Sequence, residues 1–263
     1  MSTHGSPLAT ILVAREKSTK MNLATVVPMK GASVEYPVRR TLTFLKEIGL
    51  EGADIVLKSD QEPALKDLLN TVAARRSATS KIERCDEDEQ SGDKSAQAVG
   101  RTVHESSPVG SSQSNGLIER AIQDVEGQVR TLKLAFESHL GQQIPSDHNI
   151  IPWLVEYAAV FLNRGQVGQD GKTAYGRLKG KTASLPGMQF GERLLWRTNI
   201  PARDRRNRMD TQTSEGVYLG QRTVSGEYLV GSAEGVVRPR TVYRAPLGNR
   251  WKDNLSPVTG LPW

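Results

Sequence analysis

The chain has 263 residues, of which 37% are hydrophobic and 24% charged, and its formal net charge at pH 7 is +6. This length allows one sizeable core and a second, smaller module. The sequence has no run of about 18 apolar residues, so it predicts no membrane span, and its N-terminus lacks the pattern of a secretory signal. A single cysteine, Cys85, excludes an internal disulfide. We therefore expect an intracellular protein of the nucleus or cytoplasm, without a membrane partner.

The excess of positive charge is concentrated near the C-terminus. Residues 189–263 contain 12 Lys and Arg against 7 Asp and Glu, a balance of +5. The run "RDRRNR" is the densest part, and its arginines are Arg203, Arg205, Arg206 and Arg208. A phosphate-rich partner, nucleic acid above all, is typical of such a segment. The alternative is a solvated basic surface or a flexible basic linker.

The first part of the chain predicts a β-β-α-β-α order. Two β-rich runs at 11–14 and 24–27, separated by a polar turn, indicate a hairpin. Apolar residues at helical spacing follow in "PVRRTLTFLKEIGL", which predicts a helix. A short buried strand at 55–57 then precedes a helix that begins near Pro63, a residue suited to the first turn of a helix.

The composition changes between about residues 76 and 100. The segment "SKIERCDEDEQSGDKSAQA" is polar, acidic and almost free of large apolar residues, so we expect a disordered insertion or a loosely packed loop at about 76–100. "RTVHE" then predicts a short strand. A loop rich in Ser and Gly leads into a long amphipathic helix. The next helix, "IPWLVEYAAVFLNRG", is apolar on most sides and is therefore predicted to be buried.

The predicted organisation is an α/β core at 1–165, a linker, a β module and a tail. Residues 166–188 are rich in Gly and Lys and are predicted to be the linker. Short alternating runs broken by Gly and Ser, such as "EGVYLG" and "GEYLVG", follow. They predict a small, basic, barrel-like β module at 189–250, with a tail at 251–263.

Two acidic residues stand out by their position. Asp60 comes directly after the strand "IVLKS", and Glu119 lies in the first turn of the long helix. Each has a structural explanation, because turns favour Asp and the helix dipole favours an acid near a helix N-terminus. Together they predict part of a Mg²⁺ site if the fold brings them together, because carboxylates supply the oxygen ligands that Mg²⁺ prefers. Two divalent ions about 3.5–4 Å apart catalyse displacement at phosphodiesters.

The stretches "KSDQEPAL" and "SPVGSSQSNGLIER" resemble the integrase catalytic core of retroviruses and LTR retrotransposons, especially of the copia type. "ILVAREKSTKMNLATVVPMKG" and "GKTAYGRL" resemble further parts of that core, and "SEGVYLGQRTVSGEYLVGSAEGVVRPRTVYR" resembles the β module downstream of it. The resemblance covers about residues 11–244. It implies an RNase H-like mixed sheet with flanking helices. It also implies DNA 3′-end processing and strand transfer at a D, D, E metal triad, whose second and third members correspond to Asp60 and Glu119.

The resemblance implies a cofactor, partners and further site residues. The cofactor would be Mg²⁺ or Mn²⁺, and the partners would be DNA (the element ends and target DNA) and further copies of the chain. Ser114 and Asn115 belong to the loop that would handle the DNA end. Arg130 and Lys133 lie on the polar side of the following helix, where they would approach DNA. The alternative for these two is an ordinary solvated face.

The first Asp of the triad has no counterpart in this sequence. No Asp or Glu precedes residue 11, and the first carboxylate, Glu16, lies beyond the strand that should follow the first Asp. We therefore expect a truncated core that lacks its first strand and its first metal ligand. Such a chain should bind metal weakly and be inactive or nearly so. The spacing of 58 residues between Asp60 and Glu119 is long for the family, and the acidic insertion accounts for it.

Two rival functions are open. In the first, the chain is a non-catalytic nucleic-acid-binding or assembly protein derived from a transposable element and kept for its basic module and core surfaces. In the second, it is a nuclease with an RNase H-like fold and no role in integration. The second is less favoured, because such an enzyme need not carry "QSNGLIE" or the downstream β module.

Overall fold

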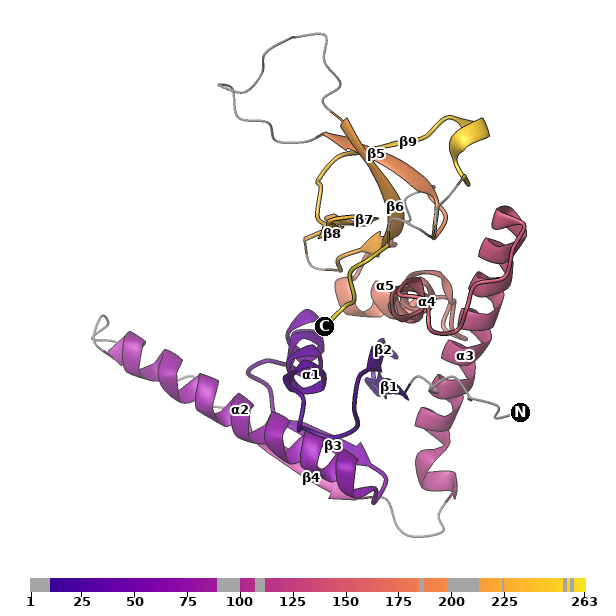
Figure 1. Ribbon diagram of the computed structural model, residues 1–263. Helices are drawn as coiled ribbons and strands as arrows, with labels where there is room; N and C mark the ends of the chain where they lie inside the picture. Colours follow the sequence, from indigo (N-terminus) through magenta and orange to yellow (C-terminus); the bar gives the residue numbers. More distant parts are fainter. Residues whose placement is uncertain are drawn as a thin grey trace, which may run out of the picture. The chain divides into compact units, whose positions relative to one another are not determined.

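The computed structural model describes residues 10–88, 100–106, 112–184, 187–197, 213–223, 225–252, 255 and 258–263 (Figure 1). These residues form two compact units that divide the chain between Ala121 and Ile122. The division falls within a helix, α3 (Ser112–Leu140). In the described ranges, no helix is both long and apolar enough to cross a membrane. The domain boundaries at 165 and 188 stay predictions.

The N-terminal unit begins with the predicted hairpin. β1 (Thr10–Arg15) and β2 (Asn22–Val27) pair antiparallel along their full length. Every residue of β2 is buried, as expected of a short run of mostly apolar residues. The hairpin therefore contributes one fully buried strand.

α1 (Glu35–Glu47) follows the hairpin and ends in a Schellman motif. Gly49 has a φ of +76°, a left-handed conformation that glycine adopts without steric cost. The N–H of Leu50 donates to the Leu45 carbonyl at 2.8 Å, and the N–H of Gly49 donates to the Lys46 carbonyl at 3.0 Å. These bonds satisfy carbonyls that the end of a helix otherwise leaves unpaired.

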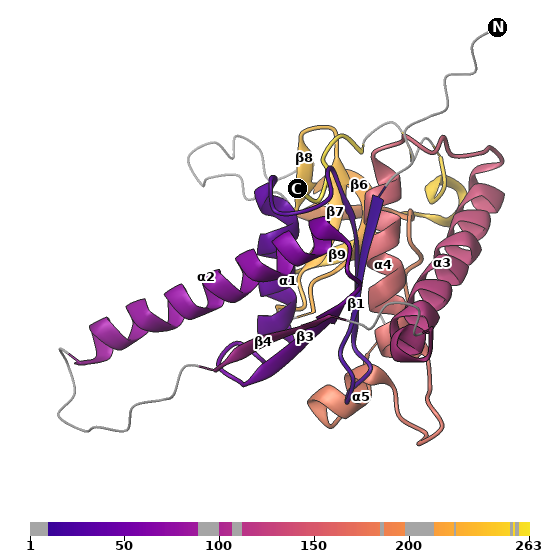
Figure 2. The same cartoon turned by 90° about the horizontal axis from the view of Figure 1, so that it is seen from below.

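A parallel strand pair completes the sheets of the N-terminal unit. β3 (Ile55–Ser59) and β4 (Thr102–Ser106) pair in register, with Ile55 opposite Thr102. Parallel strands need a long crossover connection. Here the crossover contains α2 (Pro63–Asp88), which packs against both strands (Figure 2). The element order up to this point is the predicted one.

α2 is longer than the sequence predicted. It continues to Asp88, so residues 76–88 are helical and are not the start of a disordered insertion; residues 89–99 lie outside the described residues. The prediction of disorder rested on the low content of apolar residues. A helix whose first half is already packed extends at little further cost, because propagation needs no new nucleus.

One buried arginine joins α2 to the turn before β3. Arg76 is only 6% exposed. Its guanidinium donates to three backbone carbonyls, those of Leu50, Glu51 and Ala53, at 2.7, 3.0 and 2.8 Å. It also donates to Oγ1 of Thr102 in β4. Hydrogen bonds from a charged donor are strong, so this clamp fixes the turn, the helix and the strand in one arrangement.

Gly100 lies where the chain re-enters β4, close to the same turn. A Cβ atom at Gly100 would lie 2.2 Å from the carbonyl oxygen of Ala53 and 2.5 Å from that of Gly52. We expect Gly100→Ala to destabilise the N-terminal unit by about 1–3 kcal/mol, because a backbone carbonyl cannot turn aside as a side chain can. Urea unfolding followed by circular dichroism measures the change.

The matched control is Gly127→Ala in the middle of α3. Nothing outside the backbone of its own helix lies within 4 Å of the Cβ position there. This substitution should stabilise the protein by roughly 0.5–1 kcal/mol, because alanine restricts the unfolded chain more than glycine does. Equal effects of the two substitutions would contradict the close approach at Gly100.

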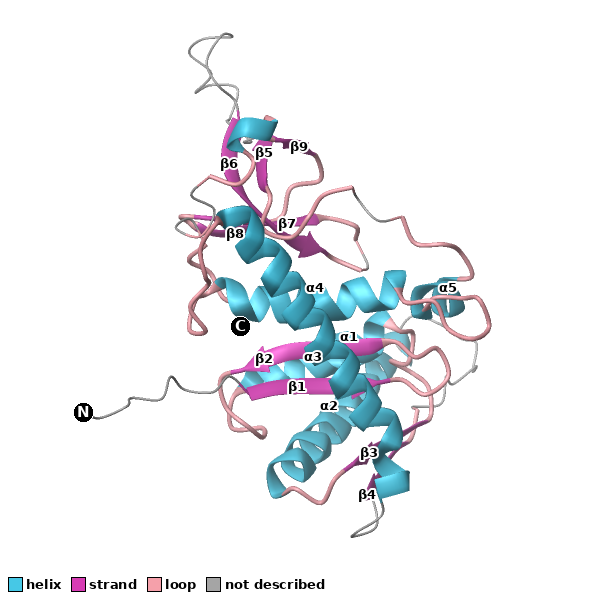
Figure 3. Ribbon diagram, turned by 90° about the vertical axis from the view of Figure 1, so that its right-hand side faces the viewer, coloured by secondary structure: helices cyan, strands magenta, loops and turns pink. Residues whose placement is uncertain are grey.

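The four strands of the N-terminal unit form two separate sheets, β1 with β2 and β3 with β4. In Figure 3, β1 and β3 lie on the inner sides of the two pairs and β2 and β4 on the outer sides. The sequence predicted one mixed sheet lacking its first strand. Parallel and antiparallel pairing are both present, but no described strand joins β1 to β3. Each pair is therefore an independent two-stranded sheet in the described part of the chain.

Among its described residues, the C-terminal unit contains two further α-helices after α3. α4 (Ile150–Gly165) is the predicted buried helix. α5 (Ala174–Lys179) lies inside the predicted linker 166–188, so this part of the linker is helical. The side chain of Thr173 caps its first turn, and Gly180 ends it with a φ of +67°. These two caps explain a short helix that carries no apolar periodicity.

The C-terminal unit contains an open antiparallel sheet with the order β8-β7-β6-β5-β9. Its strands are β5 (Arg193–Arg197), β6 (Thr213–Gln221), β7 (Tyr228–Ser232), β8 (Gly235–Val237) and β9 (Val242–Arg244), and a 3-10 helix, η2 (Leu247–Asn249), follows. The predicted β module is thus present. The predicted barrel-like closure is not seen among the described strands, where β8 and β9 are the two edges. At three residues each, they provide little backbone to pair across a closed barrel.

The core of this unit is formed by α3, α4 and the sheet. Phe136, Leu154, Phe190 and Leu219 belong to one buried cluster, and α4 packs against β6. Trp153 lies in α4, the helix that the sequence predicted to be buried, and it is 7% exposed. Large apolar side chains on one stripe of each helix account for this packing.

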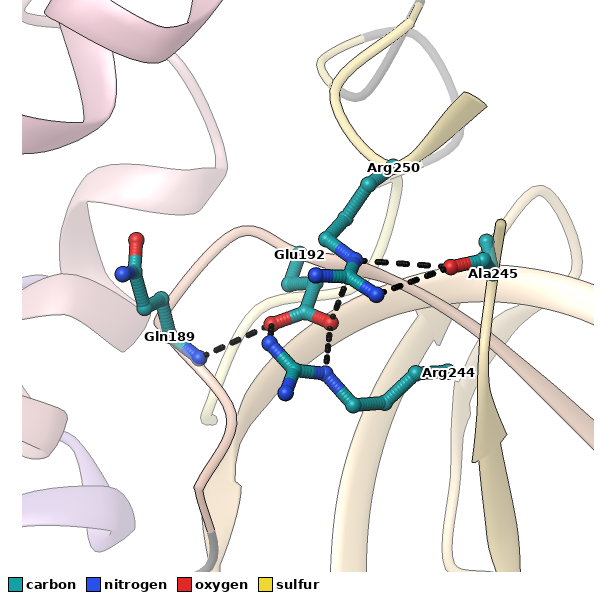
Figure 4. Close-up of polar contacts among 5 residues, drawn as sticks. All are labelled: Gln189, Glu192, Arg244, Ala245 and Arg250. Atoms are coloured by element: carbon teal, nitrogen blue, oxygen red, sulfur yellow. Dashed lines mark hydrogen bonds and ion pairs between the residues drawn. The ribbon is translucent and has the colours of Figure 1, made fainter. Parts of the chain in front are cut away.

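A buried carboxylate links the start of β5 to β9 and to the chain beyond it (Figure 4). The Glu192 side chain is fully buried. It accepts hydrogen bonds from Nε and Nη2 of Arg244 at 2.5 and 2.9 Å and from the N–H of Gln189 at 3.1 Å. Nε of Arg250 lies 3.1 Å from the same carboxylate and also bonds to the Ala245 carbonyl. A buried charge requires such partners, because desolvation without them is costly.

Candidate metal centre at the start of helix α3

The carboxyl ends of β3 and β4 carry a group of polar side chains. Asp60 follows the last residue of β3, and Oγ of Ser59 lies 3.0 Å from Nε2 of His104 in β4. Parallel strands end at the same edge of a sheet, so this edge collects an acid, a hydroxyl and an imidazole. Asp60 is exposed, and an ion or a phosphate can therefore reach it.

Asn115 brings the start of α3 to this edge. Its Nδ2 donates to Oδ1 of Asp60 at 2.5 Å, and the two residues are 55 positions apart in the chain. A hydrogen bond to a carboxylate is charge-assisted and stronger than one between neutral groups. The contact therefore holds the Asp60 carboxylate toward the first turns of α3.

Glu119 lies one helical turn beyond this contact. It follows Asn115 by four residues in α3, so the two side chains project from the same face, about 5–6 Å apart at their Cβ atoms. Glu119 is exposed, as Asp60 is. Asn115, which contacts Asp60, thus lies one helical turn before Glu119.

The donor set suits one divalent cation. Two carboxylates supply hard oxygen ligands, and their exposure leaves the remaining coordination positions to water or phosphate. In the described ranges, no group of three His, Cys, Asp or Glu side chains could hold a metal ion. A pair of ions, which needs further bridging carboxylates, does not fit the residues that the structure describes.

Glu16, the first acid of the chain, is engaged in the turn between β1 and β2. Its carboxylate accepts hydrogen bonds from the N–H groups of Ser18 and Thr19 at 2.8 and 2.5 Å, and from Oγ1 of Thr19 at 2.6 Å. Burial raises the pKa of Glu16, but these hydrogen bonds outweigh it, so the pKa lies below its ordinary value. Both carboxylate oxygens accept hydrogen bonds from residues of the turn. This structural role accounts for an acid at position 16 without a bound metal.

Arg130 and Lys133, predicted to approach DNA, both form ion pairs within α3. Arg130 lies 3.7 Å from Glu126 and its side chain is 70% exposed, whereas Nζ of Lys133 lies 2.5 Å from Glu137. Glu137 also accepts a hydrogen bond from the N–H of Ile144 at 2.7 Å. Lys133 therefore belongs to a group of contacts that joins α3 to the backbone of Ile144 through Glu137. An exposed pair is weak, so Arg130 keeps its charge available to a phosphate.

The remaining predicted nucleic-acid contacts are Ser114 and the four arginines of the basic run. Ser114 lies in the first turn of α3, next to Asn115. The four arginines of the basic run lie outside the described residues, in the segment between β5 and β6, and their role stays a prediction; they are Arg203, Arg205, Arg206 and Arg208. Sequence reasoning assigned Asn115 to DNA handling and missed its contact with Asp60. No local pattern signals a contact between residues so far apart.

Comparison with known proteins finds likeness in structure alone. No family model and no curated protein matches the chain. The crystal structure of the catalytic core domain of BIV integrase is 19% identical, with a TM-score of 0.39, over 64% of this chain and 84% of that chain. The cryoEM structure of a simian T-cell lymphotropic virus intasome in complex with PP2A regulatory subunit B56 gamma is 14% identical, with a TM-score of 0.38. This match covers 90% of this chain and 77% of that chain. At these low values neither likeness carries an argument about function.

Proposed function

We propose that this chain is an integrase-like protein derived from a retrotransposon, and that Asp60 and Glu119 hold one Mg²⁺ or Mn²⁺ ion where DNA binds. The observation that supports this most directly is the 2.5 Å hydrogen bond from Asn115 to Asp60. It joins the edge of the β3–β4 pair to the helix turn that carries Glu119. The shared exposure of both carboxylates agrees with a site that must admit a phosphodiester.

Each residue of this centre has a distinct task in the proposal. Asp60 and Glu119 bind the ion, and Asn115 orients the Asp60 carboxylate. When bound, the ion polarises a phosphate oxygen and makes a coordinated water more acidic. Complete relatives would use such chemistry to trim a DNA 3′ end and join it to target DNA. Two carboxylates cannot hold two ions in that arrangement, so we infer that the chain alone is inactive or nearly so.

Metal affinity tests the centre without requiring activity. We expect Mn²⁺ binding, measured by isothermal titration calorimetry, to weaken about ten-fold or more in Asp60→Asn and in Glu119→Gln, because each removes one anionic ligand. Glu126→Gln is the matched control, since Glu126 is an exposed acid on the same helix and should bind Mn²⁺ as the unchanged chain does. Equal affinity in all four proteins would refute the assignment.

A second candidate function is non-catalytic nucleic-acid binding or assembly. It is favoured by the lack, in the described ranges, of a third acid that could complete a metal triad. The excess positive charge of residues 189–263 supports it as well. In this function the basic segment binds phosphates, and the carboxylates have no catalytic task.

The electrostatic part of either function predicts a strong dependence on salt. We expect the affinity for a duplex oligonucleotide to fall steeply between about 50 and 200 mM NaCl, because bound phosphates release counterions. Replacing Arg203, Arg205, Arg206 and Arg208 by serine should flatten that slope. Fluorescence anisotropy measures both. A salt-independent affinity in the unchanged chain would rule out the basic segment as a DNA-binding element.

A further inference from the structure

A cavity of about 440 Å³ opens between the C-terminal end of α3 and the segment that contains η2. Its walls include His139 from α3, Gln142 just after that helix, Leu247 in η2, and Trp251 and Lys252 beyond it. All of these residues belong to the C-terminal unit. The cavity therefore shares no residue with the candidate metal centre.

Two aromatic rings form one wall of this cavity. The rings of His139 and Trp251 stack with their centroids 4.2 Å apart and their planes 7° from parallel. Trp251 also packs against Phe136, with ring centroids 6.2 Å apart, and Phe136 is only 2% exposed in the core. The contact with Phe136 thus holds the Trp251 ring against the core, while His139 is exposed. The stack therefore meets solvent at its imidazole ring.

The polar groups of the cavity suit an anion next to a flat ring. Lys252 is exposed, and its backbone carbonyl is held by a hydrogen bond from Arg193. Gln142 offers both a donor and an acceptor, and the lining residues that the structure describes include no carboxylate. An aromatic platform beside a lysine is the combination with which proteins hold unpaired nucleotides, by stacking the base and neutralising the phosphate.

We propose that this cavity binds an unpaired nucleotide of a single-stranded nucleic acid, with the base on the His139 ring and a flanking phosphate at Lys252. A duplex keeps its bases stacked on each other and cannot offer a free face to the imidazole. The site therefore distinguishes single strands from duplexes, which a basic surface alone does not. It is independent of the proposed metal centre, because it uses neither Asp60 nor Glu119.

The test uses the full chain and a fluorescently labelled 12-mer of thymidylate, with affinity measured by anisotropy. We expect His139→Ala to weaken binding about ten-fold, because a stacking partner is lost, and His139→Phe to restore it. Lys252→Gln should weaken binding by a smaller factor and reduce its salt dependence. Lys179→Gln, which changes an exposed lysine elsewhere in the same unit, should bind as the unchanged chain does.

Two further arms separate stacking from general attraction to phosphate. An abasic 12-mer offers the phosphates alone and should bind His139→Ala and the unchanged chain equally. The comparison is repeated with serine at Arg203, Arg205, Arg206 and Arg208, where the ten-fold effect of His139→Ala on the thymidylate 12-mer should persist. The proposal is overturned if His139→Ala binds that 12-mer as tightly as the unchanged chain, or if the abasic strand binds as tightly as thymidylate.

Discussion

Glu192→Ala is expected to destabilise the C-terminal unit by about 3 kcal/mol and to lower its melting temperature by roughly 10 °C. The substitution removes a fully buried carboxylate that two arginines and a backbone N–H share. Removing one partner of a buried pair costs about 3–5 kcal/mol, because the remaining charge is left desolvated. We take the lower end of that range, since the Arg244 side chain is 42% exposed and keeps some contact with water. Thermal unfolding followed by near-ultraviolet circular dichroism measures the loss.

Glu215→Gln is the control for this substitution. Glu215 pairs with Arg193 at 3.2 Å, but its side chain is 59% exposed, and such pairs contribute about 0–1 kcal/mol. Both acids lie on or next to neighbouring strands, so they differ chiefly in burial. If Glu192→Ala were no more destabilising than Glu215→Gln, the buried carboxylate would not be what holds β5, β9 and the following segment together.

Arg76→Ala should destabilise the N-terminal unit by about 3–5 kcal/mol. The guanidinium donates hydrogen bonds to the carbonyls of Leu50, Glu51 and Ala53 at 2.7–3.0 Å. Leaving a buried acceptor without its donor costs roughly 1–3 kcal/mol for each group, although water that enters the gap recovers part of it. Arg76→Lys should recover little, because an ammonium group does not reproduce the planar fork of donors. Urea unfolding of each variant, fitted with a common slope, gives the difference.

The neighbouring residue provides the comparison for Arg76. Arg75 is on the same helix and pairs with Glu35 at 3.0 Å, with side chains 45% and 66% exposed. Arg75→Ala should therefore change the stability by less than about 1 kcal/mol. We also expect Arg76→Ala to weaken the metal centre, since the clamp positions the strand pair that carries Asp60. A stable Arg76→Ala protein would mean that the turn is held by other contacts.

The elements were largely predictable, because their signals are local. β-rich runs and, in the C-terminal part, alternating runs predicted the strands. Helical spacing predicted α1 and α3, the apolar composition of its segment predicted α4, and Pro63 marked the start of α2. α5 was missed because a helix of one and a half turns has no periodicity to detect. The extension of α2 to Asp88 was missed because polar composition does not reveal that a helix is already nucleated upstream.

Features that depend on distant residues could not be predicted. Glu192 reads as an ordinary acid before a strand, yet its partner Arg244 lies 52 positions away. The sequence singled out Asp60 and Glu119, and family resemblance, not periodicity, paired them. The contact that links them, between Asn115 and Asp60, depends on how α3 returns to the end of β3. Tertiary placement of this kind has no local signal in a single sequence.

The parallel pairing of β3 and β4 has a consequence for the order in which the N-terminal unit folds. Thr10 of β1 pairs with Val27 of β2, only 17 positions away, whereas Ile55 pairs with Thr102 across 47 positions. Hairpins close in about 1–10 μs, but a long loop must be closed before distant strands gain any contact energy. We therefore expect the edge that carries Asp60 to form late, after the hairpin and α1. A nascent chain is then expected to have its local elements before it has this edge.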